Sequence, residues 1–368
     1  MDVIVVGAGL GGLAAAVGLH RAGHGVTVLE RAPESRETGA GIGIMPNGVL
    51  ALDALGLGAA IRERARAVTE PSGFRDRHGA PLLISDQAEV AETLGAPFVV
   101  VPRRWLSALL ADALPDGTIQ WGHAVTVLDE LRAGAVVIAD GAHSRLRAAL
   151  FPEHPGLRGS GEIAARAIAP RPAMPLACGE LLDHRTGRRF GCMPMSDDAV
   201  YWYATWRGTA PDDPEARRRR LLDDRADWHP CVAALVEATA AADIHVVETA
   251  QLVRPLPTFA AGRVALLGDA AHAMTPDLGQ GACQAFEDAV TLASTLDTDV
   301  PATLARYDAL RRPRTSALQR QCRQTRRVLT LRGPAGRLRD AVLRRVPSRL
   351  ATRALAAQMG FTPQPALH

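Results

Sequence analysis

The stretch that decides the fold is Asp2-Val3-Ile4-Val5-Val6-Gly7-Ala8-Gly9-Leu10-Gly11-Gly12, at the start of the chain. Residues 2–6 form a continuous apolar, β-branched run, which predicts a buried strand. Residues 13–22 have the composition of a helix, and residues 26–30 predict a second strand. The order strand, glycine-rich turn, helix, strand indicates a βαβ unit and therefore a parallel sheet.

The glycines of this turn have the spacing Gly7-x-Gly9-x-x-Gly12. In such a turn the first glycine permits the sharp bend, the second lets the backbone approach a pyrophosphate, and the third lets helix and strand pack closely. The helix N-terminus attracts phosphate charge, and Glu30, at the end of the second strand, can accept hydrogen bonds from ribose hydroxyls. The pattern predicts a dinucleotide site, but it does not separate FAD from NAD.

Composition places the chain among globular enzymes or binding proteins. It has 368 residues, of which 47% are apolar and 22% charged, enough for two compact units. Its 42 basic and 39 acidic residues give a net charge of +3, so no nucleic-acid footprint is expected. All the basic residues are arginine, and the absence of lysine excludes chemistry that needs a lysine Schiff base or a lysine nucleophile.

The cysteines and the N-terminus indicate where the protein works. The five cysteines are widely spaced and lack the spacing of a zinc site, so no bound metal is expected. We expect them to be buried free thiols in the reducing cytoplasm. Residues 3–19 are uncharged, but the glycines among them argue against a membrane span. We expect a cytoplasmic monomer or homodimer.

Two later segments extend the first motif. One is residues 264–267, a predicted strand, followed by Gly268-Asp269-Ala270-Ala271-His272 and then Pro276-Asp277-Leu278-Gly279-Gln280-Gly281-Ala282. The other is Ala139-Asp140-Gly141-Ala142-His143-Ser144-Arg145-Leu146-Arg147. With the first motif, and in this order, they resemble the motifs of class A flavin-dependent aromatic monooxygenases, a family that includes salicylate and urate hydroxylases. The resemblance covers nearly the whole chain.

The resemblance implies FAD as the cofactor and assigns residues to it. Gly7, Gly9 and Gly12 would contact the pyrophosphate, Glu30 and Arg31 the adenosine ribose, Arg103 the flavin, and Asp269 the ribityl or pyrophosphate region. The remaining expected cofactor contacts are Val125, Gly279, Gly281 and Ala282. The turn of residues 279–281 opens a predicted helix, whose free N–H groups could face the flavin N1/O2 edge.

The resemblance also implies the fold class. This is α/β, with a Rossmann-like FAD-binding domain of the p-hydroxybenzoate hydroxylase type interleaved with a β-sheet substrate domain and followed by C-terminal helices. The expected bounds are 1–70, 100–160 and 255–300 for the FAD domain, 71–99 and 161–254 for the substrate domain, and 301–368 for the helices. Between Val125 and Asp140 the chain has room for only a short turn, where relatives carry a longer segment.

The reaction implied by the resemblance is NAD(P)H-driven monooxygenation of an aromatic or heteroaromatic small molecule. NADH or NADPH would reduce the flavin, O2 would form a flavin C4a-hydroperoxide, and one oxygen atom would reach the substrate. The missing lysine disfavours a halogenase. Two alternatives stay open: a flavin-dependent dehydrogenase or reductase that inserts no oxygen, and a module that binds FAD without catalysis.

Substrate contacts are expected from the β-rich region. By strand parity Tyr201, Tyr203 and Thr205 share one face, and the residues between them share the other. The stretch 187–195 resembles the substrate strands of urate hydroxylases, which selects Arg189 and Tyr201 as the catalytic pair. The alternative is that Arg189 is a surface charge and Tyr201 packs in the core. His272 is expected to be structural.

Overall fold

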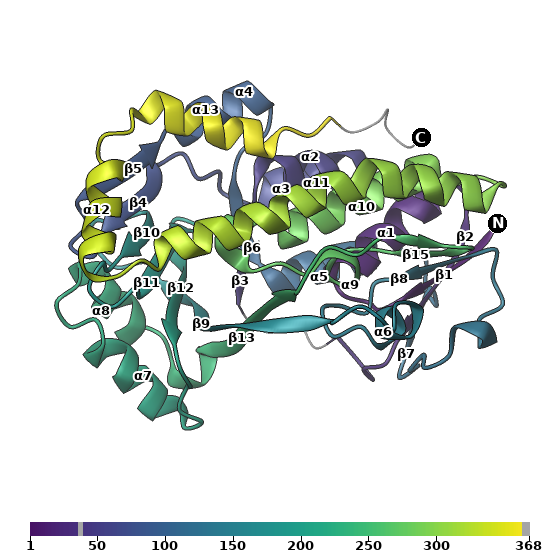
Figure 1. Cartoon of the computed structure of the whole chain (residues 1–368), viewed down its shortest axis with the longest axis horizontal. Helices are drawn as coiled ribbons and strands as arrows, with labels where there is room; N and C mark the ends of the chain where they lie inside the picture. Colours follow the sequence, from purple (N-terminus) through teal and green to yellow (C-terminus); the bar gives the residue numbers. More distant parts are fainter. Residues whose placement is uncertain (36–39, 363–368) are drawn as a thin grey trace.

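The computed structural model describes residues 1–35 and 40–362, which form two large sheets joined by helices (Figure 1). The first sheet has six strands in the order β14-β15-β8-β1-β2-β7, parallel except for β14. Its strands are β14 (Ala260–Ala261), β15 (Val264–Leu266), β8 (Ala135–Ile138), β1 (Asp2–Val6), β2 (Gly25–Glu30) and β7 (Ile119–Trp121). The parallel sheet predicted from residues 2–30 is therefore confirmed.

Small side chains let the helices of this half pack closely. Ala14, Ala15 and Ala16 of α1 are fully buried, and a Cβ atom at Gly18 would lie 3.0 Å from the Cβ of Ala293 in α10. The helices of this half are α1 (Leu10–Arg21), α2 (Pro46–Ala54), α3 (Gly58–Arg64), α5 (Arg103–Asp112), α6 (Arg145–Leu150), α9 (Asp269–His272) and α10 (Gly281–Thr295), with short η1 (Leu128–Glu130) and η3 (Pro276–Leu278). These contacts place the N-termini of α1 and α10 close to the same sheet edge.

The connection between β7 and β8 is short, as the sequence indicated. Residues 122–134 contain the 3-10 helix η1 and no strand. The six-stranded sheet therefore ends at β7 on this side.

The second sheet has seven strands in the order β13-β9-β12-β11-β10-β4-β5. They are β13 (His245–Leu252), β9 (Leu157–Pro170), β12 (Ala199–Arg207), β11 (Arg189–Pro194), β10 (Gly179–Leu182), β4 (Ser72–Asp76) and β5 (Pro81–Ser85). β11 and β12 pair in antiparallel register, with Arg189 opposite Thr205 and Met193 opposite Tyr201.

One face of this sheet is apolar. Trp202 stacks on Phe190 with ring centroids 5.5 Å apart, and both pack with Trp228 and Leu235 into a buried cluster. The helices on that face are α7 (Pro214–Asp223) and α8 (Pro230–Glu237), with η2 (Ala241–Asp243) after them. The opposite face, which carries Tyr201, is left for contacts with the FAD-side elements.

A two-stranded ladder joins the halves. It pairs β3 (Gly41–Ile44) with β6 (Val99–Pro102) in antiparallel register. A Cβ atom at Gly41 would lie 2.6 Å from the ring of Tyr201, so β3 packs directly on the second sheet. Glycine is needed at this position because no side chain fits beneath the ring.

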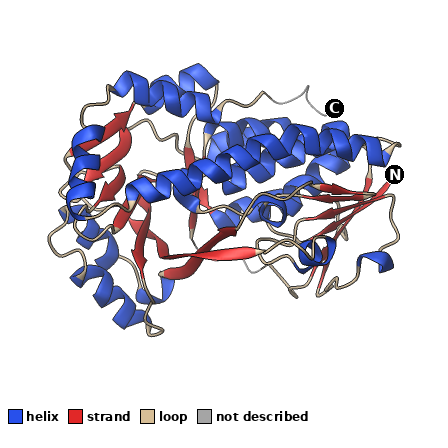
Figure 2. Cartoon of the chain, in the orientation of Figure 1, coloured by secondary structure: helices blue, strands red, loops and turns tan. Residues whose placement is uncertain are grey.

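The C-terminal helices are α11 (Val300–Leu329), α12 (Gly333–Leu343) and α13 (Ser348–Met359). Figure 1 shows α11 running along the long axis of the molecule, and Figure 2 shows the C-terminal helices in blue beside the strands in red. The sequence predicts a helical tail from residue 332 that packs on the FAD domain. The helices are confirmed. α13 contacts β5 and α4 (Gln87–Leu94) and α12 contacts β5, whereas contact with the FAD half is made by Phe361, after α13, which packs against the large core. Residues 363–368 lie outside the described residues. None of the described helices is long and apolar enough to cross a membrane.

Candidate active site

The three sequence motifs meet at one edge of the parallel sheet. Gly7 follows β1, Asp140 follows β8, Gly268 follows β15, and Glu30 ends β2. Because these strands are parallel neighbours, their carboxyl ends lie side by side. That edge is where open α/β sheets bind their ligands.

The first motif has the geometry of a dinucleotide turn. Gly7 has φ +107°, a conformation that favours glycine, and a Cβ atom there would lie 2.5 Å from the carbonyl oxygen of Ala139. A Cβ at Gly12 would lie 1.9 Å from the carbonyl oxygen of Gly7, which accounts for the close contact of helix and strand. At Gly9, the residue before α1, a Cβ would meet no atom within 4 Å. The turn therefore leaves open the position at which the pyrophosphate is expected.

Glu30 is tied into the same turn. Its two carboxylate oxygens accept hydrogen bonds from the backbone N–H groups of Ala8 and Ala32, each 2.8 Å long. Glu30 therefore connects β2 to the residue between Gly7 and Gly9. Arg31 is exposed beside it. The ribose contacts of Glu30 and Arg31 stay predictions.

The second flavin motif lies against the first. Gly268 has φ +60°, and Asp269 begins α9, with its Oδ1 4.0 Å from where a Cβ of Gly281 would lie. Gly279 has φ +63° and ends η3, after which Gly281 and Ala282 begin α10. No side chain caps the N-terminus of α10. Its first N–H groups are therefore available to an electron-rich group such as the flavin N1/O2 edge.

The Asp-Gly segment braces this loop. The Arg147 guanidinium donates hydrogen bonds to the carbonyl oxygens of Ala142 at 2.7 Å and Ala270 at 3.2 Å. Burial raises the pKa of Asp140, opposed by a hydrogen bond from Ser144. Arg147 therefore holds the backbone beside Asp269. The part in NAD(P)H use that the family resemblance implies for this Asp-Gly segment stays a prediction.

The other two expected cofactor residues lie on flanking elements. Arg103 begins α5, and its N–H donates to the carbonyl oxygen of Ala40 at 2.9 Å, next to β3. Val125 lies in the connection after β7 and packs against the large core. Their contacts with FAD stay predictions.

A buried polar network supports the second motif, and the sequence reasoning missed most of it. Asp288 of α10 accepts a hydrogen bond from the N–H of Gly268 at 3.0 Å and pairs with Nε2 of His272 at 2.6 Å. Arg311 of α11 contacts Asp288 at 2.6 Å and Glu287 at 2.5 Å. Burial alone would raise the pKa of Asp288, but His272 and Arg311 lower it to about 2. His272 is fully buried in this network, in agreement with the structural role expected for it.

The network continues to the start of α2. The side-chain amide of Asn47 donates to Glu287 at 2.7 Å and to Gln280 at 2.9 Å. Gln280 precedes α10, so Asn47 ties the Gly279–Gly281 turn to α2. The only sequence signal for this set was the Glu287-Asp288 pair after the glycine turn.

Arg189 is buried in a cluster of carboxylates on the substrate sheet. It is 3% exposed, so its interpretation as a surface charge is wrong. Its guanidinium lies 2.9 Å from Asp277, 3.3 Å from Glu180 and 3.4 Å from Glu162. Burial alone would lower the pKa of Arg189, but the three carboxylates outweigh it and raise the pKa. Asp277 follows Pro276 in η3, so this ion pair joins the substrate sheet to the second flavin motif.

Two tyrosines lie along the same face. Tyr201 packs against a small buried cluster of Val68, Phe98, Val100 and Cys178, as do Met45, Met193 and Met195. The ring of Tyr203 lies 6.2 Å from that of Tyr201 and covers Gly191. Burial raises the pKa of both phenols. Tyr203 lies between Tyr201 and the Arg189 cluster, because it pairs with Gly191 while Arg189 pairs with Thr205.

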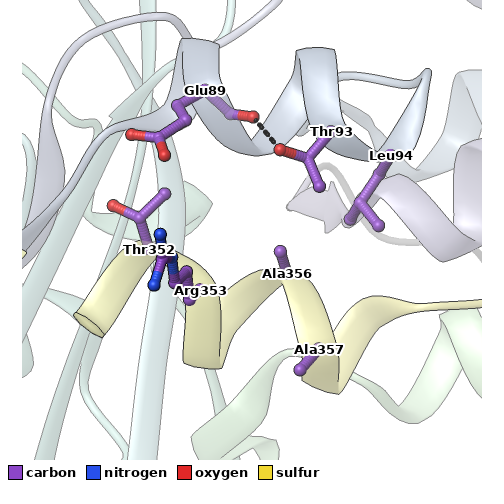
Figure 3. Close-up of a pocket in the computed structure, with 7 residues that line it drawn as sticks. All are labelled: Glu89, Thr93, Leu94, Thr352, Arg353, Ala356 and Ala357. Atoms are coloured by element: carbon purple, nitrogen blue, oxygen red, sulfur yellow. Dashed lines mark hydrogen bonds between the residues drawn. The ribbon is translucent and has the colours of Figure 1, made fainter. Parts of the chain in front are cut away.

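A separate surface groove of about 340 Å³ lies between α4 and α13 (Figure 3). Glu89 and Thr93 line one wall, and Thr352 and Ala356 line the other. None of the predicted site residues contributes to it. It is therefore not the candidate active site.

Comparison with known proteins identifies the family. A family model described as FAD binding domain matches residues 1–130 and 122–322. The aurachin C monooxygenase/isomerase of Stigmatella aurantiaca is 33% identical, over 84% of this chain and 85% of that protein. The chain belongs to the FAD-dependent monooxygenases. The FAD-dependent urate hydroxylase of Klebsiella pneumoniae is 32% identical, over 84% of this chain and 86% of that protein.

A solved structure supports the same assignment. The structure of Klebsiella pneumoniae HpxO complexed with FAD and uric acid matches with a TM-score of 0.88 and 27% identity, covering 98% of this chain and 96% of that one. The expected α/β fold, FAD as cofactor and the enzyme class are therefore confirmed for this FAD-dependent monooxygenase. NAD(P)H is the co-substrate typical of the class.

Proposed function

We propose that this FAD-dependent monooxygenase hydroxylates a small electron-rich aromatic or heteroaromatic ring that carries N–H, amino or hydroxyl donors. It uses NADH or NADPH and O2, and works in the cytoplasm as a monomer or homodimer. The observation that carries the proposal is the charge on the substrate sheet. Glu162, Glu180 and Asp277 surround one cation, Arg189, next to the second flavin motif.

The excess of carboxylates decides which groups this face accepts. Three ionised carboxylates against one guanidinium leave a net negative, largely buried cluster, which disfavours a substrate carboxylate at that point. Hydrogen-bond donors on a ring would satisfy the carboxylate oxygens instead. Burial raises the pKa of Glu162 and of Glu180, and the charge of Arg189 opposes that shift. The relative named as a urate hydroxylase is compatible with such a ring.

The protein's part in the reaction is binding, orientation and exclusion of water. Bound FAD supplies the hydride and oxygen chemistry. Gly9 and the α1 N-terminus would hold the pyrophosphate, and the α10 N-terminus would face the flavin edge. The ring of Tyr201, fixed over β3, would orient the substrate. Arg189 would act as a positioning residue, because it holds Asp277 beside the flavin-side turn.

Substrate-stimulated turnover tests the function. We expect purified yellow protein to oxidise NADH or NADPH slowly alone and faster with one member of a panel of aminophenols, hydroxypyridines, purines and salicylates. The product should be hydroxylated and O2 consumption stoichiometric. Anaerobic turnover with an artificial electron acceptor and no oxygenated product would instead support the dehydrogenase alternative. Light scattering of the same sample distinguishes monomer from homodimer.

Arg189 and its neighbour Arg188 offer a matched pair. Arg189→Gln should lower kcat/KM about 10- to 100-fold, because one charge-assisted interaction contributes roughly 1.5–3 kcal/mol. Both Arg189→Gln and Tyr201→Phe should lose more NAD(P)H as hydrogen peroxide. The reason is that a misplaced substrate ring is not in position to accept the oxygen atom. FAD content should stay unchanged in Tyr201→Phe, and Arg189→Gln is compared with wild type at equal bound FAD, because its three carboxylates lose their shared cation.

The control is Arg188→Gln, which removes an arginine that pairs with Asp224 instead of the cluster. It should keep wild-type coupling, measured as product formed per NAD(P)H oxidised. Wild-type coupling in Arg189→Gln and Tyr201→Phe would assign both residues to structure alone.

A further inference from the structure

Helix α12 buries an ion pair beside Leu343, which packs on the cluster of Leu82, Leu182 and Leu329, and it exposes two other apolar side chains. Its buried side carries Arg339 and Asp340, which form an ion pair at 2.6 Å, and Asp340 also contacts His184 at 3.3 Å. Its outer side carries Leu338 and Val342, one turn apart, with exposed fractions of 66% and 53%. A helix on the surface of a globular protein normally presents its polar face to water. The exposed face of α12 is therefore suited to contact something other than water.

The exposed apolar residues concentrate here. Among the described residues, the three most exposed large apolar side chains are Leu338, Val342 and Leu350. Leu350 is the third residue of the next helix, α13. Isolated exposed apolar residues are ordinary, but a group of them on one short segment marks an interaction surface. The groove in Figure 3 lies farther along α13, at Thr352–Ala357, and is separate from this face.

The segment around α12 is strongly basic. Residues 320–353 contain eleven arginines and one acidic residue, Asp340, a formal charge of +10, whereas the whole chain has +3. Within the described residues, Arg337, Arg345 and Arg349 form no ion pair. Arg337 and Arg345 flank Leu338 and Val342 along α12 and its C-terminal turn. We call Leu338, Val342, Leu350 and these three arginines the α12 face.

We propose that the α12 face docks this enzyme on the surface of an anionic lipid bilayer. Leu338 and Val342 enter the boundary between headgroups and acyl chains, while the arginines contact the lipid phosphates and carboxylates. A second copy of the chain fits poorly, because two faces of high positive charge repel each other. An acidic protein fits less well, because residues 320–353 offer arginine but no Trp or Tyr to anchor a protein interface.

Vesicle binding of the FAD-loaded enzyme tests the proposal. We expect sedimentation with phosphatidylcholine vesicles that contain phosphatidylserine, and little with phosphatidylcholine alone. Binding should weaken as salt is raised, because surface charges are screened. Replacing Arg337, Arg345 and Arg349 with Gln should weaken binding about 100-fold, at about fivefold for each arginine near the lipid surface. Leu338→Gln with Val342→Gln should release the protein even at low salt.

Matched variants elsewhere separate this face from general charge. Arg132, Arg158 and Arg219 are exposed arginines outside the segment, and their triple Gln variant has the same net charge as the test triple. Val127→Gln with Val253→Gln removes two other exposed valines. These controls should bind vesicles like wild type, and all variants should keep wild-type NAD(P)H oxidation.

Three results would overturn the proposal. The first is equal binding to neutral and anionic vesicles, or none to either, which includes the case of an acidic protein partner. The second is an equal loss of binding in the control variants. The third is a dimer in light scattering that Leu338→Gln with Val342→Gln dissociates, which would assign the face to a second copy.

Discussion

Gly9→Val folds like the wild type but binds FAD about 100-fold more weakly, if the first motif holds the pyrophosphate. A side chain at residue 9 meets no protein atom within 4 Å, so the apoprotein accommodates it. The valine side chain would, however, occupy the open space beside residue 9 in which the pyrophosphate of FAD is expected. Overlap of this kind costs about 1–3 kcal/mol, or up to about 100-fold in affinity. The flavin absorbance of the purified protein and titration of apoprotein with FAD measure the effect.

A control separates lost FAD from lost structure. Gly159→Val, in β9, also places a side chain where no protein atom lies within 4 Å, but far along the chain from the motif. It should retain the wild-type FAD affinity. Full FAD affinity in Gly9→Val would remove the first motif from the cofactor site. Gly12→Val is a poorer test, because its Cβ would overlap the Gly7 carbonyl and damage the fold itself.

Arg311→Ala is expected to destabilise the protein by about 3–5 kcal/mol. Arg311 is buried between α10 and α11, and its removal leaves Asp288 with His272 alone and Glu287 with Arg314 as its remaining cation. An uncompensated buried charge is costly because water cannot solvate it. Asp288 also holds Gly268, so the second flavin motif should loosen and FAD should dissociate more easily.

The neighbouring residue supplies the comparison. Arg312 forms an i,i+4 pair with Asp308 on the surface, at 3.1 Å, and Arg312→Ala should cost less than about 1 kcal/mol. Chemical unfolding of both variants and the wild type, with and without added FAD, measures the difference. Equal stability of the two variants would show that the buried network does not support the motif.

The cofactor half could be predicted from the sequence because its signals are local. The glycine spacing 7, 9, 12 encodes a turn, a close approach and a helix contact within six residues; the structure has the turn at Gly7 and the helix contact at Gly12, and it leaves open space at Gly9. The parity of Tyr201 and Trp202 likewise follows from strand geometry alone, and Trp202 indeed lies in the opposite, apolar face.

The remainder depends on contacts between distant parts of the chain. Arg189 obtains its carboxylates from β9, β10 and η3, a set that no local spacing reveals. The composition of residues 332–353 predicts helices, but not that β5 and α4 would be their support. The burial of Asp340 on the inner side of α12 depends on its contact with His184, which lies in the turn after β10. Sequence reasoning therefore predicted which residues would contact the flavin and missed the partners that hold them in place.

The central claim is that this enzyme transfers one atom of O2 to an aromatic ring. The most direct test is turnover of the best substrate of the panel under 18O2 in ordinary water, followed by mass spectrometry of the product. The account predicts one 18O atom in each product molecule, and none when 16O2 is used in H2(18)O. A product whose new oxygen comes from water, or a product without new oxygen, would contradict the claim.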